Sequence, residues 1–158
     1  MSTIFVGYKL SKDDSDYLVE TINFNLEKTY PPHCTLIYAN CTVEDAKKNG
    51  FKTIEDWEKY IKNKTPIELP ASAIIRNLEW WGGHDDSGYV VANLGFPEAI
   101  ISNHALIKCG LKSDFPKYTP HMTLITPINE DDGKAYIKKY DFLIGYKMIF
   151  DDVIYERF

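Results

Sequence analysis

A length of 158 residues fits one domain, and we take residues 1–158 as a single domain. The hydrophobic share of 44% and the charged share of 26% are those of a globular chain, which excludes a fibrous or disordered protein. The formal net charge of −5 argues against a protein that coats duplex DNA, but it permits a small phosphorylated ligand in a local pocket.

The first half of the chain alternates predicted strands and helices. In chain order, apolar periodicity predicts a strand over 4–10, a helix over 13–27, a strand over 33–38, a helical turn over 42–48 and a helix that begins after residue 53. Ser11, Thr42 and Thr53 precede the three helical segments, where a side-chain oxygen can cap the first turn.

The second half is richer in strands. Two β-rich runs over 67–81 and 89–94 flank a loop over 82–88, and a helix that starts at Pro97 ends near Gly110. The chain is completed by a strand over 118–126, a helix over 131–139 and two strands over 142–150 and 153–158. Because strands and helices mix without a regular βαβ repeat, the sequence predicts an α+β fold with an antiparallel sheet.

The sequence carries no signal for secretion or for a membrane. No apolar run approaches the roughly 20 residues that span a bilayer, and the first eight residues lack the basic and apolar regions of a signal peptide. The three cysteines, Cys34, Cys41 and Cys109, have no metal-type spacing and indicate reduced thiols. We therefore expect a cytoplasmic protein without a membrane partner, whose oligomeric state the sequence leaves open.

One segment of eight residues occurs twice. Residues 30–37 are YPPHCTLI and residues 118–125 are YTPHMTLI, so six of the eight positions are identical. Such internal similarity indicates two related halves that offer the same strand to a shared centre. Successive side chains of a strand point to opposite faces, so each histidine shares a face with the threonine two residues later.

The pairs His33 with Thr35 and His121 with Thr123 suit proton transfer around a phosphoryl group. One imidazole can take a proton while the other gives one, and the threonine hydroxyls can donate hydrogen bonds to phosphoryl oxygens. This chemistry needs no metal and no cofactor, and we expect neither. A lone His-x-Thr on a strand mostly has no catalytic meaning, but a purely structural repeat has no need to keep both polar residues.

The motifs HCTL at 33–36 and HMTL at 121–124 resemble the paired motifs of the 2H phosphoesterase superfamily. The resemblance implies metal-independent chemistry on RNA-type phosphodiesters and a bilobed α+β fold. In that fold two antiparallel sheets, related by a pseudo-two-fold axis, flank a catalytic groove, with helices outside. With IFVGY at 4–8 and the pair Trp80 and Trp81, the chain is most similar to the anti-CBASS phosphodiesterases of tailed phages. This implies that its substrates are the cyclic di- and trinucleotides of bacterial antiviral signalling.

The resemblance assigns roles to individual residues. His33 and His121 are the expected acid–base pair, and Thr35 and Thr123 are the expected phosphate-binding residues. A ribose 2′-OH would attack its own 3′-phosphate while one histidine removes its proton and the other protonates the leaving 5′-oxygen. Water would then open the resulting 2′,3′-cyclic phosphate. Which histidine acts first as the base stays open.

A bound cyclic nucleotide also needs surfaces on which its bases stack, each worth about 1–3 kcal/mol. Tyr8, Trp80 and Trp81 are candidates for this substrate-binding role. Trp80 and Trp81 would face opposite ways on a strand, so that at most one reaches the groove. Glu156 is either an acceptor for an adenine amino group or a solvated charge on the last strand.

Three alternatives stay open. An RNA-end phosphodiesterase that acts on 2′,3′-cyclic ends or 2′–5′ junctions would gain from a basic groove, which the net charge of −5 does not favour. A protein that sequesters a cyclic nucleotide without cleaving it has no need for two full His-x-Thr pairs. A Cys34 nucleophile is disfavoured because alternation puts this thiol on the face opposite His33.

Overall fold

The computed structural model describes residues 1–22, 24, 31–82, 87–113 and 117–158 and confirms the α+β class. In chain order its elements are β1 (Ser2–Leu10), α1 (Lys12–Thr21), β2 (His33–Cys41), α2 (Val43–Lys48), α3 (Ile54–Lys64), β3 (Ala71–Gly82), β4 (Gly88–Gly95), α4 (Pro97–Lys108), β5 (His121–Ile128), α5 (Glu130–Lys139), a 3₁₀-helix (Asp141–Leu143) and β6 (Lys147–Arg157). Within the described ranges, no helix has both the length and the apolar character needed to cross a membrane.

The strands of the described residues form one six-stranded sheet, in the order β2-β1-β6-β3-β4-β5, where the resemblance implied two sheets. All of its strand pairs are antiparallel. The sheet is continuous because β6 serves both halves: its first residues pair with β3 and its later residues pair with β1. A single strand therefore joins what would otherwise be two separate sheets.

The prediction of two C-terminal strands is wrong. Asp141–Leu143 form the 3₁₀-helix, and Gly145 follows at a φ of 94°, a left-handed conformation that favours glycine. From Lys147 onward a single strand continues through the acidic pair Asp151 and Asp152. Its register against β1 shifts between Lys9 and Leu10, so an irregularity in the pairing takes the place of the predicted break.

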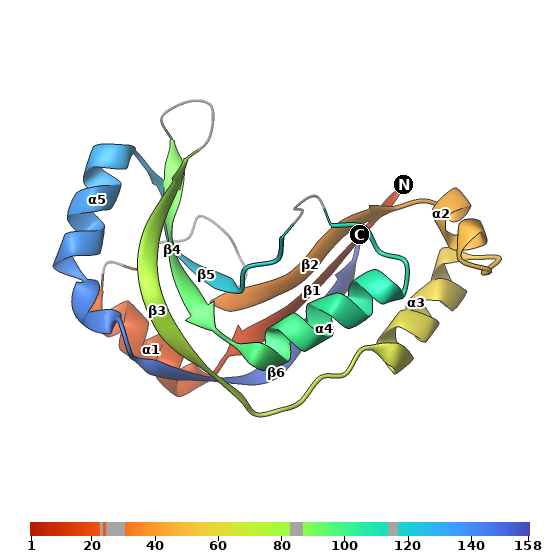
Figure 1. The fold of residues 1–158 in the computed structure, drawn as a ribbon, viewed down its shortest axis with the longest axis horizontal. Helices are drawn as coiled ribbons and strands as arrows, with labels where there is room; N and C mark the ends of the chain where they lie inside the picture. Colours follow the sequence, from red (N-terminus) through yellow and green to blue (C-terminus); the bar gives the residue numbers. More distant parts are fainter. Residues whose placement is uncertain (23, 25–30, 83–86, 114–116) are drawn as a thin grey trace.

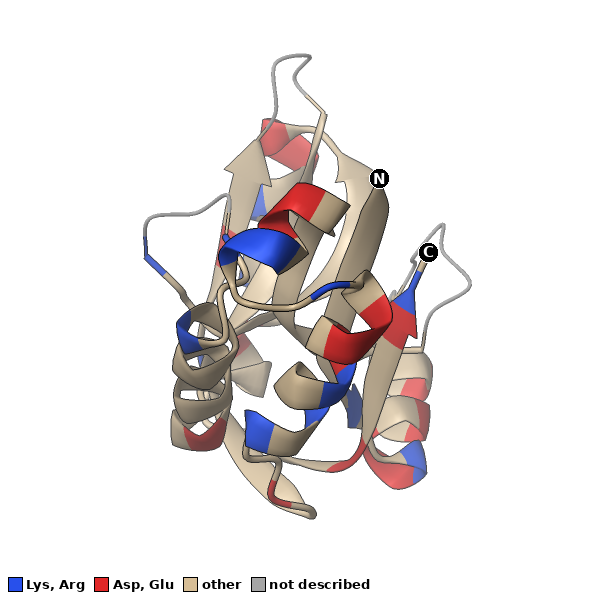
Figure 2. Ribbon diagram, turned by 90° about the vertical axis from the view of Figure 1, so that its right-hand side faces the viewer, with Lys and Arg blue, Asp and Glu red and all other residues tan. Residues whose placement is uncertain are grey.

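The three predicted N-caps are confirmed. The side-chain oxygens of Ser11, Thr42 and Thr53 each accept a hydrogen bond from a backbone N–H in the first turn of the helix that follows. Both α2 and α3 have acidic residues in the first turn and lysines in the last turn, as the separate red and blue segments in Figure 2 show. This order of charges favours each helix through its dipole.

The first helix is shorter than predicted. The chain leaves α1 at Ile22, which is extended at φ −124° and buries its side chain in the core. Of the rest of the predicted helix, residue 24 is not helical, and residues 23 and 25–27 lie outside the described part of the chain. Residues 83–86 of the predicted loop over 82–88 lie outside it as well.

Helices of the described part of the chain cover one face of the sheet. Helix α4 packs on β2, and α5 packs on β3 and β4 at the other end of the sheet (Figure 1). Most buried apolar side chains form a single cluster on this helix face. Phe5 and Val91 are only 5% and 0% exposed but lie outside that cluster. Because their sequence neighbours belong to it, they point to the opposite face, which we call the site face.

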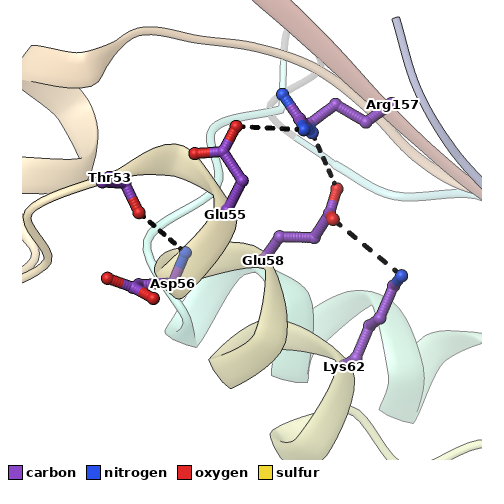
Figure 3. Close-up of polar contacts among 6 residues, drawn as sticks. All are labelled: Thr53, Glu55, Asp56, Glu58, Lys62 and Arg157. Carbon is purple, nitrogen blue, oxygen red and sulfur yellow. Dashed lines mark hydrogen bonds and ion pairs between the residues drawn. The ribbon is translucent and has the colours of Figure 1, made fainter.

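Ion pairs fasten the end of β6 to α3 (Figure 3). The Arg157 guanidinium lies 3.2 Å from a Glu55 oxygen and 3.1 Å from a Glu58 oxygen, and the Lys62 ammonium lies 3.9 Å from Glu58. Ion pairs as exposed as these contribute only about 0–1 kcal/mol each. They connect the end of β6, where Glu156 precedes Arg157, to α3.

Candidate functional site

Each of the two histidines lies at the start of an edge strand. His33 is the first residue of β2 and His121 is the first residue of β5, and the burial pattern of the first five residues is the same in both strands. The histidine and the threonine are partly exposed in each copy. The residues between and after them are at most 1% exposed, namely Cys34, Leu36, Met122 and Leu124. The predicted alternation of faces is therefore confirmed.

Both imidazoles are held by the same hydrogen bond. Nδ1 of His33 lies 2.8 Å from the carbonyl oxygen of Pro31, and Nδ1 of His121 lies 2.9 Å from that of Thr119. A carbonyl oxygen only accepts, so Nδ1 carries a proton and donates it in this bond. The bond selects the tautomer whose lone pair is on Nε2, and proton exchange with a substrate would take place there.

The starts of β2 and β5 lie against each other, although these strands are the two ends of the sheet order (Figure 1). The Tyr118 hydroxyl, three residues before His121, donates a 2.7 Å hydrogen bond to the carbonyl oxygen of Thr35. Its oxygen also lies 3.7 Å from the Cys34 sulfur, which forms a further hydrogen bond with the His121 backbone. The sheet curls so that the repeated motifs meet.

Cys34 lies at this junction as a core residue. Its side chain is 0% exposed, and burial raises the pKa of the thiol to about 12 despite its hydrogen bond with Tyr118. A thiol rather than a thiolate is present at neutral pH, and the thiolate is the nucleophilic form. The geometry therefore gives no support to a Cys34 nucleophile.

Different aromatic rings flank the two histidines. Phe5 of β1 makes an edge contact with His33, with ring centroids 5.3 Å apart at 87°, and Trp81 of β3 contacts His121 at 4.5 Å and 57°. Burial lowers the pKa of His121 below its usual 6.5, and the hydrogen bond to Thr119 offsets only part of this. Burial therefore favours the neutral form of the His121 ring.

The adjacent tryptophans of β3 face opposite ways, as predicted, and Trp81 is the one beside a histidine. Trp80 donates a 2.9 Å hydrogen bond from Nε1 to the carbonyl oxygen of Ile128 and packs on α5. The approach there is so close that a Cβ on Gly133 would lie 2.5 Å from the indole ring. Trp80 thus joins the helix to the sheet on the face away from the site.

The Tyr8 side chain points to the face opposite the histidines, although Tyr8 pairs with Cys34 in the register of β1 and β2. It is 0% exposed, and its ring packs against Phe96 at 4.9 Å and Phe150 at 6.5 Å on the helix face. Its hydroxyl lies 3.4 Å from the Ser102 oxygen. The β1 residue beside His33 is Phe5, which was not among the residues predicted from the sequence. If Tyr8 points into the core, alternation places Phe5, three residues earlier, on the opposite face.

Glu156 is exposed on the site face. It is the cross-strand partner of Phe5 in the register of β1 and β6, and paired residues of adjacent strands project to the same side. Because Phe5 also touches His33, the Glu156 carboxylate is on the same side of the sheet as that imidazole. Among the described residues, no group of three His, Cys, Asp or Glu side chains is arranged to hold a metal ion.

The comparisons with known proteins show a distant similarity to a phage protein. A segment of 67 residues is 31% identical to the Anti-CBASS protein Acb1 of Vibrio phage KVP40. The match covers 39% of this chain and 44% of that protein, so less than half of either chain is shared. The sequence matches no protein-family model.

Proposed function

We propose that this protein is a metal-independent phosphodiesterase that opens 3′–5′ bonds of cyclic di- and trinucleotides, as a 2H phosphoesterase that counters bacterial antiviral signalling. Its place of action would be the host cytoplasm. Distant similarity to a phage anti-CBASS protein supports the biological role. In this proposal residues 1–158 act as one domain whose two lobes share β6.

One observation carries the proposal. Two His-x-Thr pairs begin the two edge strands, and these strands meet where Tyr118 bonds to the Thr35 carbonyl at 2.7 Å. Both histidines have Nδ1 bonded to a backbone carbonyl oxygen, at 2.8 and 2.9 Å. General acid–base catalysis on both sides of one phosphate needs two such imidazoles, one neutral and one charged.

The first step is an internal transesterification. The ribose 2′-oxygen forms a bond to the adjacent 3′-phosphorus, and the bond from phosphorus to the 5′-oxygen of the next nucleotide breaks. One Nε2 takes the 2′-OH proton, and the other histidine, protonated beforehand, gives its proton to the leaving 5′-oxygen. The product is a ring-opened isomer that ends in a 2′,3′-cyclic phosphate. Since the nucleophile belongs to the substrate, its proximity is already supplied.

We assign the role of first base to His121. Burial keeps its pKa below 6.5, so the ring is neutral and able to accept a proton at pH 7. His33 then acts as the acid. In the second step water replaces the 5′-oxygen, the two histidines exchange roles, and the 2′,3′-cyclic phosphate opens. Thr35 and Thr123 donate to the phosphoryl oxygens as charge develops there.

Of the candidate base-binding residues, Trp81 and Glu156 remain in the proposal. Trp81 is in ring contact with His121, so a base stacked on its indole would hold a phosphate near that imidazole. Glu156 lies on the side of the sheet that carries Phe5 and can accept from a base amino group. The burial of Tyr8 and the packing of Trp80 against α5 remove these two residues from it.

A substrate panel tests the proposal. The purified protein is incubated in excess EDTA with 3′,3′-cyclic dinucleotides, a cyclic trinucleotide, a 2′,3′-cyclic mononucleotide and a 2′–5′ dinucleotide, and the products are followed by mass. We expect ring opening of the cyclic oligonucleotides, and its loss in His33→Ala. Cleavage of the mononucleotide or the 2′–5′ dinucleotide alone would instead assign the protein to RNA-end processing. Tight binding without cleavage would identify a sequestering protein.

A further inference from the structure

Two asparagines lie in one cross-strand row with His121. Asn77 of β3 is the cross-strand partner of Asn93 of β4, and Asn93 is in turn the partner of His121 of β5. Cross-strand partners share a face, so both carboxamides lie on the site face. Asparagine is depleted in strands, and Asn93 interrupts a run of buried apolar residues in β4.

Only one of the two polar side-chain atoms of Asn93 has a hydrogen-bond partner among the described residues. The residue is 8% exposed, and its Nδ2 donates a 2.7 Å hydrogen bond to Oδ1 of the exposed Asn77. Its own Oδ1 is buried and has no hydrogen-bond partner in the described part of the chain. Native proteins leave few buried acceptors unpaired, because each one loses its hydration without compensation. Asn77 fixes the amide, so the oxygen is the atom left for a ligand.

The chemistry of this oxygen limits what it can bind. An amide oxygen only accepts hydrogen bonds, so it is suited to an N–H or O–H group and not to a phosphate oxygen. Its neighbours on the same face are His121 and, one pair further along, Thr123, which pairs with Val91. A ribonucleotide whose phosphate lies at these two residues carries donors of two kinds, its ribose hydroxyls and the amino groups of its bases.

We propose that Asn93 is a specificity residue that accepts a hydrogen bond from a ribose hydroxyl or a base amino group of the nucleotide bound beside His121. The inference rests on the proposed function, because it takes the nucleotide site at His121 as given. Asn77 makes no contact with the nucleotide in this proposal; it is a positioning residue that directs the Asn93 oxygen toward the ligand.

The test variant is Asn93→Leu, which removes the acceptor and keeps a side chain of similar size. The exposed Asn77 can then bond to water. Asn103→Leu is the matched control. Asn103 is 1% exposed, donates one 2.7 Å bond to the Leu36 carbonyl and also has an Oδ1 without a partner among the described residues, but it belongs to α4. Its loss should lower the Tm and leave nucleotide affinity unchanged.

Affinity is measured in a His33→Ala background, so that the ligand survives, with 3′,3′-cyclic diadenylate and 3′,3′-cyclic diguanylate as probes. We expect Asn93→Leu to raise the Kd of the better ligand about tenfold, and Asn77→Ala to raise it about threefold. Analogues that lack the 2′-hydroxyls or the base amino groups identify the donor. The tenfold loss should disappear for the analogue without the recognised group.

The outcomes separate the inference from the proposed function. An unchanged Kd in both Asn93→Leu and Asn77→Ala overturns the inference, while turnover by the wild-type protein would leave the proposed function intact. A loss of the same size with every analogue also overturns it. If Asn93→Leu does not fold, Asn77→Ala alone decides, because Asn77 is exposed. A wild-type protein that neither binds nor opens any cyclic nucleotide overturns both proposals.

Discussion

The half of the molecule around His33 and the half around His121 share their chemistry and differ in their surroundings. Each imidazole is the first residue of an edge strand, and each Nδ1 bonds to the carbonyl oxygen two residues earlier. Beside His33 lies Phe5, which is 5% exposed, whereas beside His121 lies the larger and partly exposed Trp81. The features that we propose to move protons are duplicated, and those that we propose to contact a base are not.

The largest effect should come from removing either imidazole. We expect His33→Ala and His121→Ala each to lower turnover of a cyclic dinucleotide by about 10²–10⁴-fold, because each removes one proton-transfer group. Steady-state kinetics measures this, with unfolding curves to verify the fold. His104→Ala, on the exposed side of α4, is the matched control and should keep full activity. Near-normal turnover in either motif variant would contradict the equivalence of the two halves.

The threonines should contribute less than the histidines, and both to a similar extent. Thr35→Val and Thr123→Val keep the β-branched shape and remove only the hydroxyl that would donate to the phosphate. We expect kcat to fall about 10- to 100-fold in each variant, the lower part of the range for one lost transition-state donor. Single-turnover rates at saturating substrate measure the effect. An unchanged rate in both variants would exclude the hydroxyls from the chemistry.

The tryptophan pair tests the difference between the halves. Trp81→Ala should raise KM about tenfold through the loss of one stacking surface, with little loss of stability. Trp80→Ala should leave KM unchanged and lower the free energy of unfolding by about 3 kcal/mol, because it removes packing against α5. Kinetics and urea titrations on the same two variants provide the comparison. A higher KM in Trp80→Ala and a lower free energy of unfolding in Trp81→Ala would contradict the directions in which these two side chains point from β3.

The pH dependence tests the role of His121. If it is the first base, kcat/KM should decline on the acid side with a midpoint below 6.5, because burial lowers its pKa from that value. The unfolded chain, with the higher pKa, binds the proton more tightly, so acidification through pH 6.5 should also favour unfolding. His121→Gln should reduce this acid destabilisation. An acid midpoint above 6.5 would contradict the assignment.

The sequence could predict those parts of the site that depend on local pattern. A period of two residues was sufficient to place His33 with Thr35 on one face and Cys34 on the other. The same rule predicted that Trp80 and Trp81 point apart. It could not tell which of them lies beside a histidine, because that depends on how β3 and β4 pair and on how the sheet curls.

The parts that were missed depend on long-range pairing. Tyr8 was predicted as a substrate-binding residue and Phe5 was not, whereas the register with β2 and β6 places Phe5 on the face that carries His33. The two predicted strands were separated at Asp151 and Asp152, yet β6 continues through both residues, and its register with β1 shifts there. That single strand also explains why one sheet forms where the resemblance implied two.

The most direct test of the central claim, that two histidines catalyse attack by the substrate's own 2′-hydroxyl, is the time course of products from a 3′,3′-cyclic dinucleotide in excess EDTA. The account predicts that a linear isomer of unchanged mass, ending in a 2′,3′-cyclic phosphate, appears first and is followed by a product heavier by one water. Neither should form from the 2′-deoxy analogue. Cleavage of that analogue, or opening without the isomer, would contradict the account.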